Sequence, residues 1–238
     1  MAEKYFAASN SSEGFCSYYN EVFNSEKLYK IYVIKGGSGT GKAFFMNEVA
    51  KSAELNGFSV RYIYCSSDAN SLDGIIINEL KIAVLDGTAP HVYEPKYVGA
   101  VESFVNLAEF LDEKMLASSR KVIENISAEK KRGFERVYRN LSAYRSLSEN
   151  IEDIVFPCIK YEKIKKYVQR FAEGLEKENG EEERLLTRGI GMRGLSSFDT
   201  YFENAKIYYE INDYFETANF MMREIYALMR ENKINMRI

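Results

Sequence analysis

The apolar and polar positions near the N-terminus change from a strand pattern to a helix pattern within a few residues. Lys30–Lys35 is a short β-rich run that leads directly into a cluster of glycines. Lys42–Asn56 then has apolar residues at helical spacing, up to Gly57, and Ser59–Cys65 is again rich in β-branched and aromatic residues. The order predicts a strand–loop–helix–strand unit, and such a crossover is right-handed and joins parallel strands.

Long helical patterns replace the strand signals after residue 101. Apolar residues repeat at spacings of three and four in two segments: Phe134, Val137, Leu141 and Tyr144, and then Tyr161, Ile164, Val168, Phe171 and Leu175. Pro157 marks the start of the second helix. We therefore expect a core over 1–101, a helical hairpin inserted over 102–180, and a return to the core over 181–238.

The last segment repeats the first. A shift of 176 residues places Lys30–Tyr62 on Lys206–Ile238 without a gap, and Gly14–Tyr18 is echoed by Gly194–Phe198 after a short deletion. This similarity suggests an internal duplication; the alternative is two unrelated strand–helix units that agree by chance. Residues 212–218 correspond to residues 36–42 of the first copy but lack their glycines and Lys42. The chain stops at what would be the second strand of this copy. We therefore expect a truncated, degenerate repeat.

The composition bears on which compartment the protein occupies and which classes of partner it binds. The net charge of −3 gives no overall field that would attract nucleic acid or an anionic membrane. Three cysteines without a CxxC pair and a single histidine give no zinc-ligand spacing. With no apolar run long enough to span a bilayer, we expect a cytoplasmic protein whose possible protein partners include copies of itself.

The glycine cluster has the chemistry of a phosphate-binding loop. Gly36, Gly37, Ser38, Gly39, Thr40, Gly41 and Lys42 satisfy the pattern GxxxxGK between a predicted strand and a predicted helix. Glycines let the backbone point successive N–H groups at phosphates, the helix start adds its positive dipole end, and Lys42 reaches the β- and γ-phosphates. The alternative is a glycine turn without a ligand. We expect ATP, or secondarily GTP, to bind here.

Two further positions affect whether the loop can bind Mg²⁺. Ala43 stands where a serine or threonine would place a hydroxyl on Mg²⁺, which predicts weakened metal binding and slow turnover. A third predicted strand, Lys81–Leu85, ends on Asp86, where an acid can hold the metal beside the loop. Asp86-Gly87 is also a common turn dipeptide. Lys42 and Asp86 are the candidate catalytic residues, with Asp86 the candidate magnesium ligand.

Other candidates are weaker. Asp68 follows the second strand, at the sheet edge where open α/β sheets bind ligands, and His91 lies just beyond Asp86. Arg132, Arg136 and Arg139 share a helical face but alternate with glutamates, which favours a solvated helix. Arg188 and Arg193 follow the insertion and are candidates to return to the site as charge-stabilising arginines.

The stretch from Lys30 to Val101 resembles an uncharacterised family of bacterial P-loop ATPases with two tandem P-loop halves. The resemblance depends on the glycine loop and, more specifically, on Cys65–Asp68 with Ser71–Gly74, Glu79-Leu-Lys81, and Asp86–Val92. Family members carry serine or threonine at the position of Ala43 and have a longer second half. The resemblance therefore implies an ATPase whose activity is reduced in this chain.

These observations predict an α/β protein of the P-loop NTPase class. It would have a mainly parallel sheet, a long helical-hairpin insertion, and a truncated second copy. The leading functional hypothesis is an ATP-binding protein of the ATPase kind, with ATP and Mg²⁺ as cofactors. A small-molecule or nucleotide kinase with the insertion as its lid is one alternative. A module that binds ATP without hydrolysing it is another.

Overall fold

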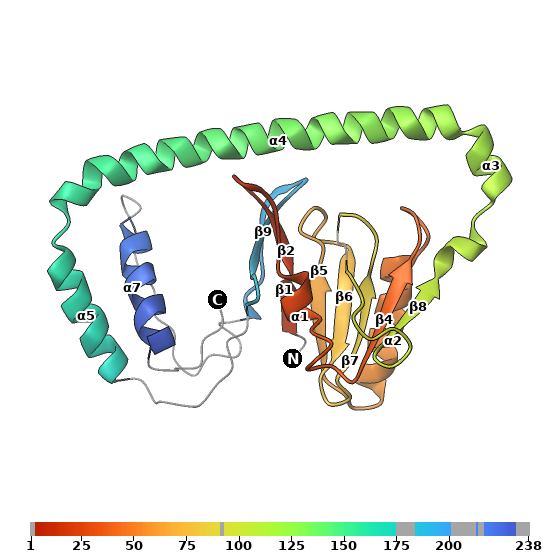
Figure 1. The fold of residues 1–238 in the computed structure, drawn as a ribbon, viewed down its shortest axis with the longest axis horizontal. Helices are drawn as coiled ribbons and strands as arrows, with labels where there is room; N and C mark the ends of the chain where they lie inside the picture. The colour runs from red at the N-terminus through yellow and green to blue at the C-terminus, as the bar shows by residue number, and fades with distance from the viewer. Residues whose placement is uncertain (1–2, 91–92, 175–183, 201–212, 214–216, 232–238) are drawn as a thin grey trace.

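A six-stranded sheet forms the centre of the protein (Figure 1). The structure is a computed structural model that describes residues 3–90, 93–174, 184–200, 213 and 217–231. The strands lie in the order β1 (Glu3–Phe6), β5 (Val60–Tyr64), β6 (Leu72–Ile77), β7 (Ile82–Asp86), β4 (Lys30–Lys35) and β8 (Glu102–Asn106).

The sheet is mainly parallel, as the sequence predicts, and β6 alone runs against the other five strands. β1 pairs parallel with β5, and β4 pairs parallel with both β7 and β8, whereas β6 is antiparallel to β5 and to β7. β4 and β5 are therefore parallel to each other, but the β6–β7 hairpin lies between them. Because β6 runs backward, its first residues lie at the carboxyl ends of its neighbours.

Both faces of the sheet are apolar. The helix α2 (Lys42–Leu55) covers one face, where Ile34, Met46 and Ile75 are fully buried. The other face packs on α1 (Tyr19–Val22) and its flanks, with Tyr5, Phe23 and Ile31 fully buried. The glycine loop therefore connects two elements that are both anchored in the core.

β8 extends the sheet beyond residue 101, where the core was expected to end. Its first residue, Glu102, is fully buried, and its carboxylate accepts hydrogen bonds from the N–H groups of Tyr97 (2.8 Å) and Lys96 (3.2 Å) and from the hydroxyl of Tyr93 (3.2 Å). A short 3-10 helix, η1 (Leu107–Phe110), and α3 (Glu113–Ser118) follow. The buried glutamate fixes the loop that leads into β8.

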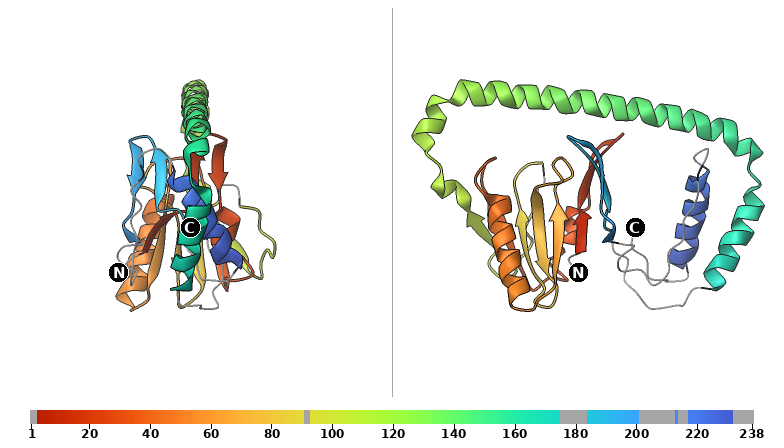
Figure 2. Two further views of the ribbon diagram at one scale, coloured as in Figure 1. Left: turned by 90° about the vertical axis from the view of Figure 1, so that its left-hand side faces the viewer. Right: turned by 180° about the vertical axis from the view of Figure 1, so that it is seen from behind.

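The expected helical hairpin is not formed, although both of its helices exist. α4 (Arg120–Val155) has 36 residues and is about 54 Å long, whereas α5 (Tyr161–Glu173) has 13. After the short 3-10 turn η2 (Phe156–Cys158), α5 packs along α7 (Ala218–Glu231) and not along α4. Figure 2 shows α5 and α7 side by side, with α4 passing over the sheet. α4 is contacted by other parts of the chain at few places, and none of its residues is buried.

Two small hairpins follow the same plan in the two halves of the chain. Adding 180 to the residue numbers of β2 (Ala8–Ser11) and β3 (Gly14–Ser17) gives those of β9 (Arg188–Gly191) and β10 (Gly194–Ser197), with the same register. Each second strand begins with a glycine at positive φ, 110° at position 14 and 96° at position 194. The similarity seen in the sequence covers only the second strand of each hairpin, and the structure extends it to the first strand.

The shift of 176 residues also relates the helices α2 and α7, because adding it to the bounds of α2 gives those of α7. The strand expected at the start of this repeat lies outside the described residues, as does most of the loop. Within the ranges that the structure describes, no helix is both long and apolar enough to cross a bilayer.

Candidate functional site

The glycine loop, residues 36–42, joins the end of β4 to the start of α2. Gly39 and Gly41 have φ of 82° and 83°, in the left-handed region that side chains disfavour. Gly36 is buried, and a Cβ added to it would lie 2.7 Å from Oγ1 of Thr40, whose hydroxyl donates to the carbonyl of Gly37 at 2.9 Å. The loop therefore needs glycine at positions 39 and 41 for their positive φ, and at position 36 because the Thr40 side chain leaves no room for a Cβ.

Several backbone N–H groups of this loop have no acceptor. In the part of the chain that the structure describes, none is found for Gly39 or for residues 41–44, and no side chain caps α2. The first hydrogen bond of the helix is donated by Phe45 to the carbonyl of Gly41, at 2.9 Å. Free N–H groups at a helix start attract anions, because they carry the positive end of the helix dipole.

Lys42 extends from the start of α2 back into the loop. Its Nζ donates to the carbonyls of Gly36 at 2.9 Å and Gly37 at 2.8 Å, and it lies 3.5 Å from Oδ2 of Asp86. Both charged side chains are largely buried, with 11% and 15% of their areas exposed. The structure therefore brings together the lysine and the acid that the sequence singled out.

Asp86 is held by its own turn and by the neighbouring strand. Its Oδ1 accepts hydrogen bonds from the backbone N–H of Thr88 at 2.9 Å and from the Thr88 hydroxyl, so Oδ2 alone faces Lys42. Lys35, at the end of β4, donates from Nζ to the carbonyl of Gly87 at 2.5 Å. A Cβ on Gly87 would lie 2.3 Å from Cγ1 of Val33, so this turn is close-packed against β4. Asp86 is thus both a turn residue and a member of the site.

Tyr19, which the sequence did not single out, links the backbone of Asp86 to that of Asp73 on β6. Tyr19, on α1, is 2% exposed, and its hydroxyl donates to the carbonyls of Asp73 at 2.7 Å and Asp86 at 3.1 Å. Burial raises the pKa of Tyr19 well above its ordinary value, and the carboxylates of Asp73 and Asp86 raise it further. Asp73 is itself buried in β6. Asp73 lies near Asp86 because β6 runs antiparallel to β7, so the start of β6 is beside the end of β7.

The donors present fit a magnesium ion that is held mainly by phosphate. No cluster of three or more acidic, histidine or cysteine side chains suited to a metal occurs within the described ranges, and Oδ2 of Asp86, which is paired with Lys42, is an acidic oxygen beside the loop that accepts no hydrogen bond from Thr88. Ala43 packs against the apolar cluster under α2 and contributes no oxygen. Mg²⁺ commonly binds through one or two carboxylates together with substrate phosphates and water.

The remaining candidates lie elsewhere or act locally. Asp68 follows β5, and its Oδ1 accepts from the N–H of Asn70 at 3.2 Å, as in a turn. The side chains of Arg132, Arg136 and Arg139 are exposed on α4, as expected for a solvated helix. His91 lies outside the described residues.

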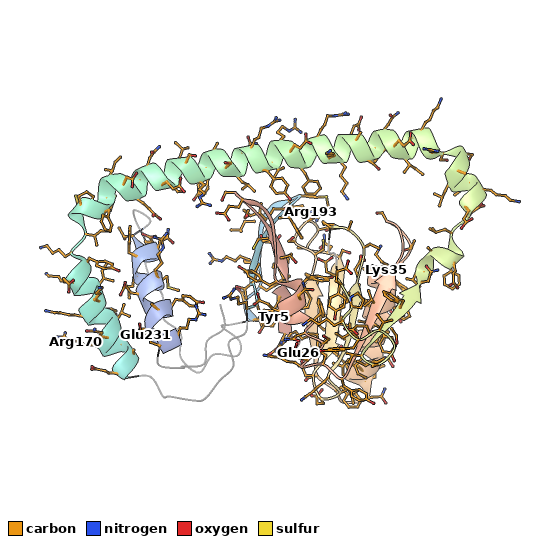
Figure 3. The ribbon with its side chains drawn as sticks, in the orientation of Figure 1. Tyr5, Glu26, Lys35, Arg170, Arg193 and Glu231 are labelled. Carbon is orange, nitrogen blue, oxygen red and sulfur yellow. The ribbon has the colours of Figure 1, made fainter. Side chains whose placement is uncertain are left out.

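The arginines Arg188 and Arg193 lie on the β9–β10 hairpin, Arg188 at its start and Arg193 in its turn. Figure 3 shows Arg193 and Lys35 on the side of the sheet that faces α4. Arg193 therefore lies at the same end of the sheet as the end of β4, whereas Arg188 is at the end of the hairpin away from the turn.

Comparisons with protein-family models, with curated proteins and with solved structures gave no match to this chain.

Proposed function

We propose that this protein binds ATP through the glycine loop, which would act as a P-loop. The observation that carries the proposal is the position of Lys42, whose ammonium lies within the loop beside unpaired N–H groups and 3.5 Å from Asp86. A polyphosphate would replace the two loop carbonyls as the partner of Lys42. Charge-assisted contacts of this kind are about twice as strong as neutral hydrogen bonds.

The acid beside Lys42 supports a nucleotide with its metal rather than a bare anion. Asp86 would repel an isolated phosphate, whereas Oδ2 can hold Mg²⁺ bound to the same phosphates. Such an ion would supply charge neutralisation at the transferred phosphoryl group. The residues of this chain would orient the phosphate chain: Lys42 from the helix, the N–H groups from the loop, and Asp86 from β7.

The presence of alanine at position 43 favours the hypothesis that ATP is hydrolysed slowly. Its methyl group packs into the apolar cluster, so the position offers no oxygen to a metal. We propose a weak ATPase. ATP binding without hydrolysis is a second candidate, favoured by the same observation.

The P-loop assignment and the duplication belong to one proposal about the fold. The strand–loop–helix order of β4 and α2, the equal bounds of α2 and α7 under one shift, and the equal hairpins under another support two copies of one unit. The loop of the second copy, residues 212–218, has no glycine or lysine. Nucleotide binding is therefore assigned to the first copy.

Titration calorimetry tests the proposal, with ATP added to the whole chain in EDTA and in Mg²⁺. We expect saturable binding of ATP that Lys42→Ala weakens at least tenfold, since about 1.4 kcal/mol corresponds to that factor. Lys51→Ala is the matched control, because Lys51 is an exposed lysine of the same helix that pairs with Glu48. Absence of ATP binding, or equal affinity in the two variants, would refute the assignment.

A further inference from the structure

The two hairpins are not only alike but also contact each other through equivalent residues. Phe6 and Leu186, which are 180 residues apart, exchange both backbone hydrogen bonds, at 2.7 and 3.1 Å. Asn10 donates from Nδ2 to the carbonyl of its own equivalent, Ile190, at 2.7 Å. A surface in which each residue meets its own counterpart is the signature of a two-fold axis.

The local bonds around each hairpin also repeat. The N–H of Tyr18 donates to the carbonyl of Ala7 at 2.8 Å, and the N–H of Phe198 donates to that of Thr187 at 2.9 Å. The two copies are therefore related by a pseudo-two-fold axis, with segments 6–18 and 186–198 interlocked across it. The second copy lies against the first as a partner subunit would in a symmetric dimer.

This arrangement places the second hairpin on the carboxyl end of β5. The ring of Phe198 packs on Tyr64 with centroids 4.9 Å apart, and the N–H of Met192 donates to the carbonyl of Ser67 at 3.0 Å. A Cβ on Gly191 would lie 2.4 Å from the carbonyl oxygen of Ser66. Three positions at or just after the end of β5, Tyr64, Ser66 and Ser67, thus contact the second copy.

Arg193 is held by this docking at the edge of the sheet where the glycine loop lies. It is exposed and follows Met192 in the two-residue turn of the hairpin. Among the described residues it has no ion-pair partner, whereas Arg184 lies 3.8 Å from Glu21. The end of β5 is separated by β6 and β7 from the end of β4, where the glycine loop begins, so the two ends are about 14 Å apart at the usual strand spacing. An arginine side chain and a phosphate chain together can span that gap.

We propose that Arg193 of the second copy binds the terminal phosphates of ATP held by the first copy. The inference depends on the proposed function, since it assigns a further residue to the same site. It also explains why the second copy needs no phosphate-binding loop of its own to act in the protein: its hairpin supplies a cation. The charges agree with this role: Asp86 offsets the charge of Lys42, so Arg193 would add a further positive charge for the phosphates.

The test compares Arg193→Ala with Arg188→Ala in the whole chain. Arg188 is an exposed arginine of the same hairpin, at the end away from the turn. Calorimetry with ATP and with AMP should show ATP affinity reduced about tenfold or more by Arg193→Ala alone, the size expected for a charged contact, with little effect on AMP. Equal ATP affinities for the two variants would overturn the proposal.

A second pair of variants tests the docking itself. Gly191→Ala places a methyl group against two backbone oxygens, at 2.4 and 2.9 Å, whereas Gly189→Ala meets only the ring of Phe6 at 3.4 Å. We expect Gly191→Ala alone to speed amide hydrogen exchange at Met192 and to reproduce the loss of ATP affinity. Unchanged ATP affinity with fast exchange at Met192 would overturn the role of the turn. If the unmodified protein binds no ATP, the proposed function fails as well; if it binds ATP and Arg193→Ala matches Arg188→Ala, only this inference fails.

Discussion

Replacing Tyr19 by phenylalanine tests whether the floor of the site is built as described. The change removes one hydroxyl and leaves the ring in place, 4.9 Å from the ring of Phe23. The carbonyls of Asp73 and Asp86 both lose the hydroxyl as a donor. An unsatisfied buried polar group costs about 1–3 kcal/mol. For a chain of this length each kcal/mol lowers the melting temperature by about 2–4 °C.

Thermal unfolding followed by circular dichroism gives this magnitude directly. Tyr29→Phe is the matched control, because Tyr29 is 75% exposed and the same atom is removed. We expect a loss of at least about 1 kcal/mol for Tyr19→Phe and almost none for the control. Equal melting temperatures for the two variants would refute the bridging role of the hydroxyl and, with it, the support of Asp86 from below.

Three further outcomes are expected. Since the pKa of Tyr19 is raised when folded, the unfolded chain loses this proton first, so stability should fall as pH rises above the ordinary value of 10; urea titrations should show a shallower fall in Tyr19→Phe. Asp86→Asn should weaken ATP binding in Mg²⁺ and not in EDTA, because the carboxylate favours the metal-bound nucleotide and repels bare phosphates; equal effects would leave Asp86 a turn residue. Ala43→Ser should raise the magnesium dependence of ATP binding and speed any phosphate release, with metal-free affinity nearly unchanged; an unchanged magnesium response would show that position 43 is not the metal position.

The central strands and the first helix were predictable because their patterns are local. Lys30–Lys35 and Lys42–Leu55 form a strand and a helix almost at the expected bounds, and the third strand begins one residue later than expected. β6 was missed because all six of its residues are buried, so it shows no alternation. The short strands of the hairpins give too few residues for any period.

The prediction of a helical hairpin was wrong because the periodicity of apolar residues identifies a helix but not the element it packs against. α5 carries a strong apolar face, and that face packs on α7, which comes from the C-terminal repeat. Tyr161 of α5 donates a hydrogen bond to Glu224 of α7, and the ring of Phe156 in the preceding turn η2 lies 5.4 Å from that of Phe220 on α7. The long α4 instead touches the first hairpin, through Tyr138. Contacts of this range cannot be read from the spacing of apolar residues.

The positions of the glycine loop, Lys42 and Asp86 could be predicted, since the glycines follow one strand and Asp86 ends another. The contributions of Tyr19 and Asp73 could not, because they depend on which strands are neighbours. The similarity of Gly14–Tyr18 to Gly194–Phe198 indicated a duplication, but it did not predict that each segment belongs to a hairpin. The pairing of Phe6 with Leu186 was not predictable, because similarity between two segments does not show that they touch.

The most direct test of ATP binding at the glycine loop is an NMR titration of the amide-labelled protein with ATP in EDTA. The N–H groups of Gly39 and residues 41–44, which have no acceptor among the described residues, should receive the phosphates. We predict that these amide signals shift saturably with ATP and that Lys42→Ala abolishes the shifts at the same ATP concentration. Saturable shifts confined to other parts of the chain, or no shifts at all, would contradict the account.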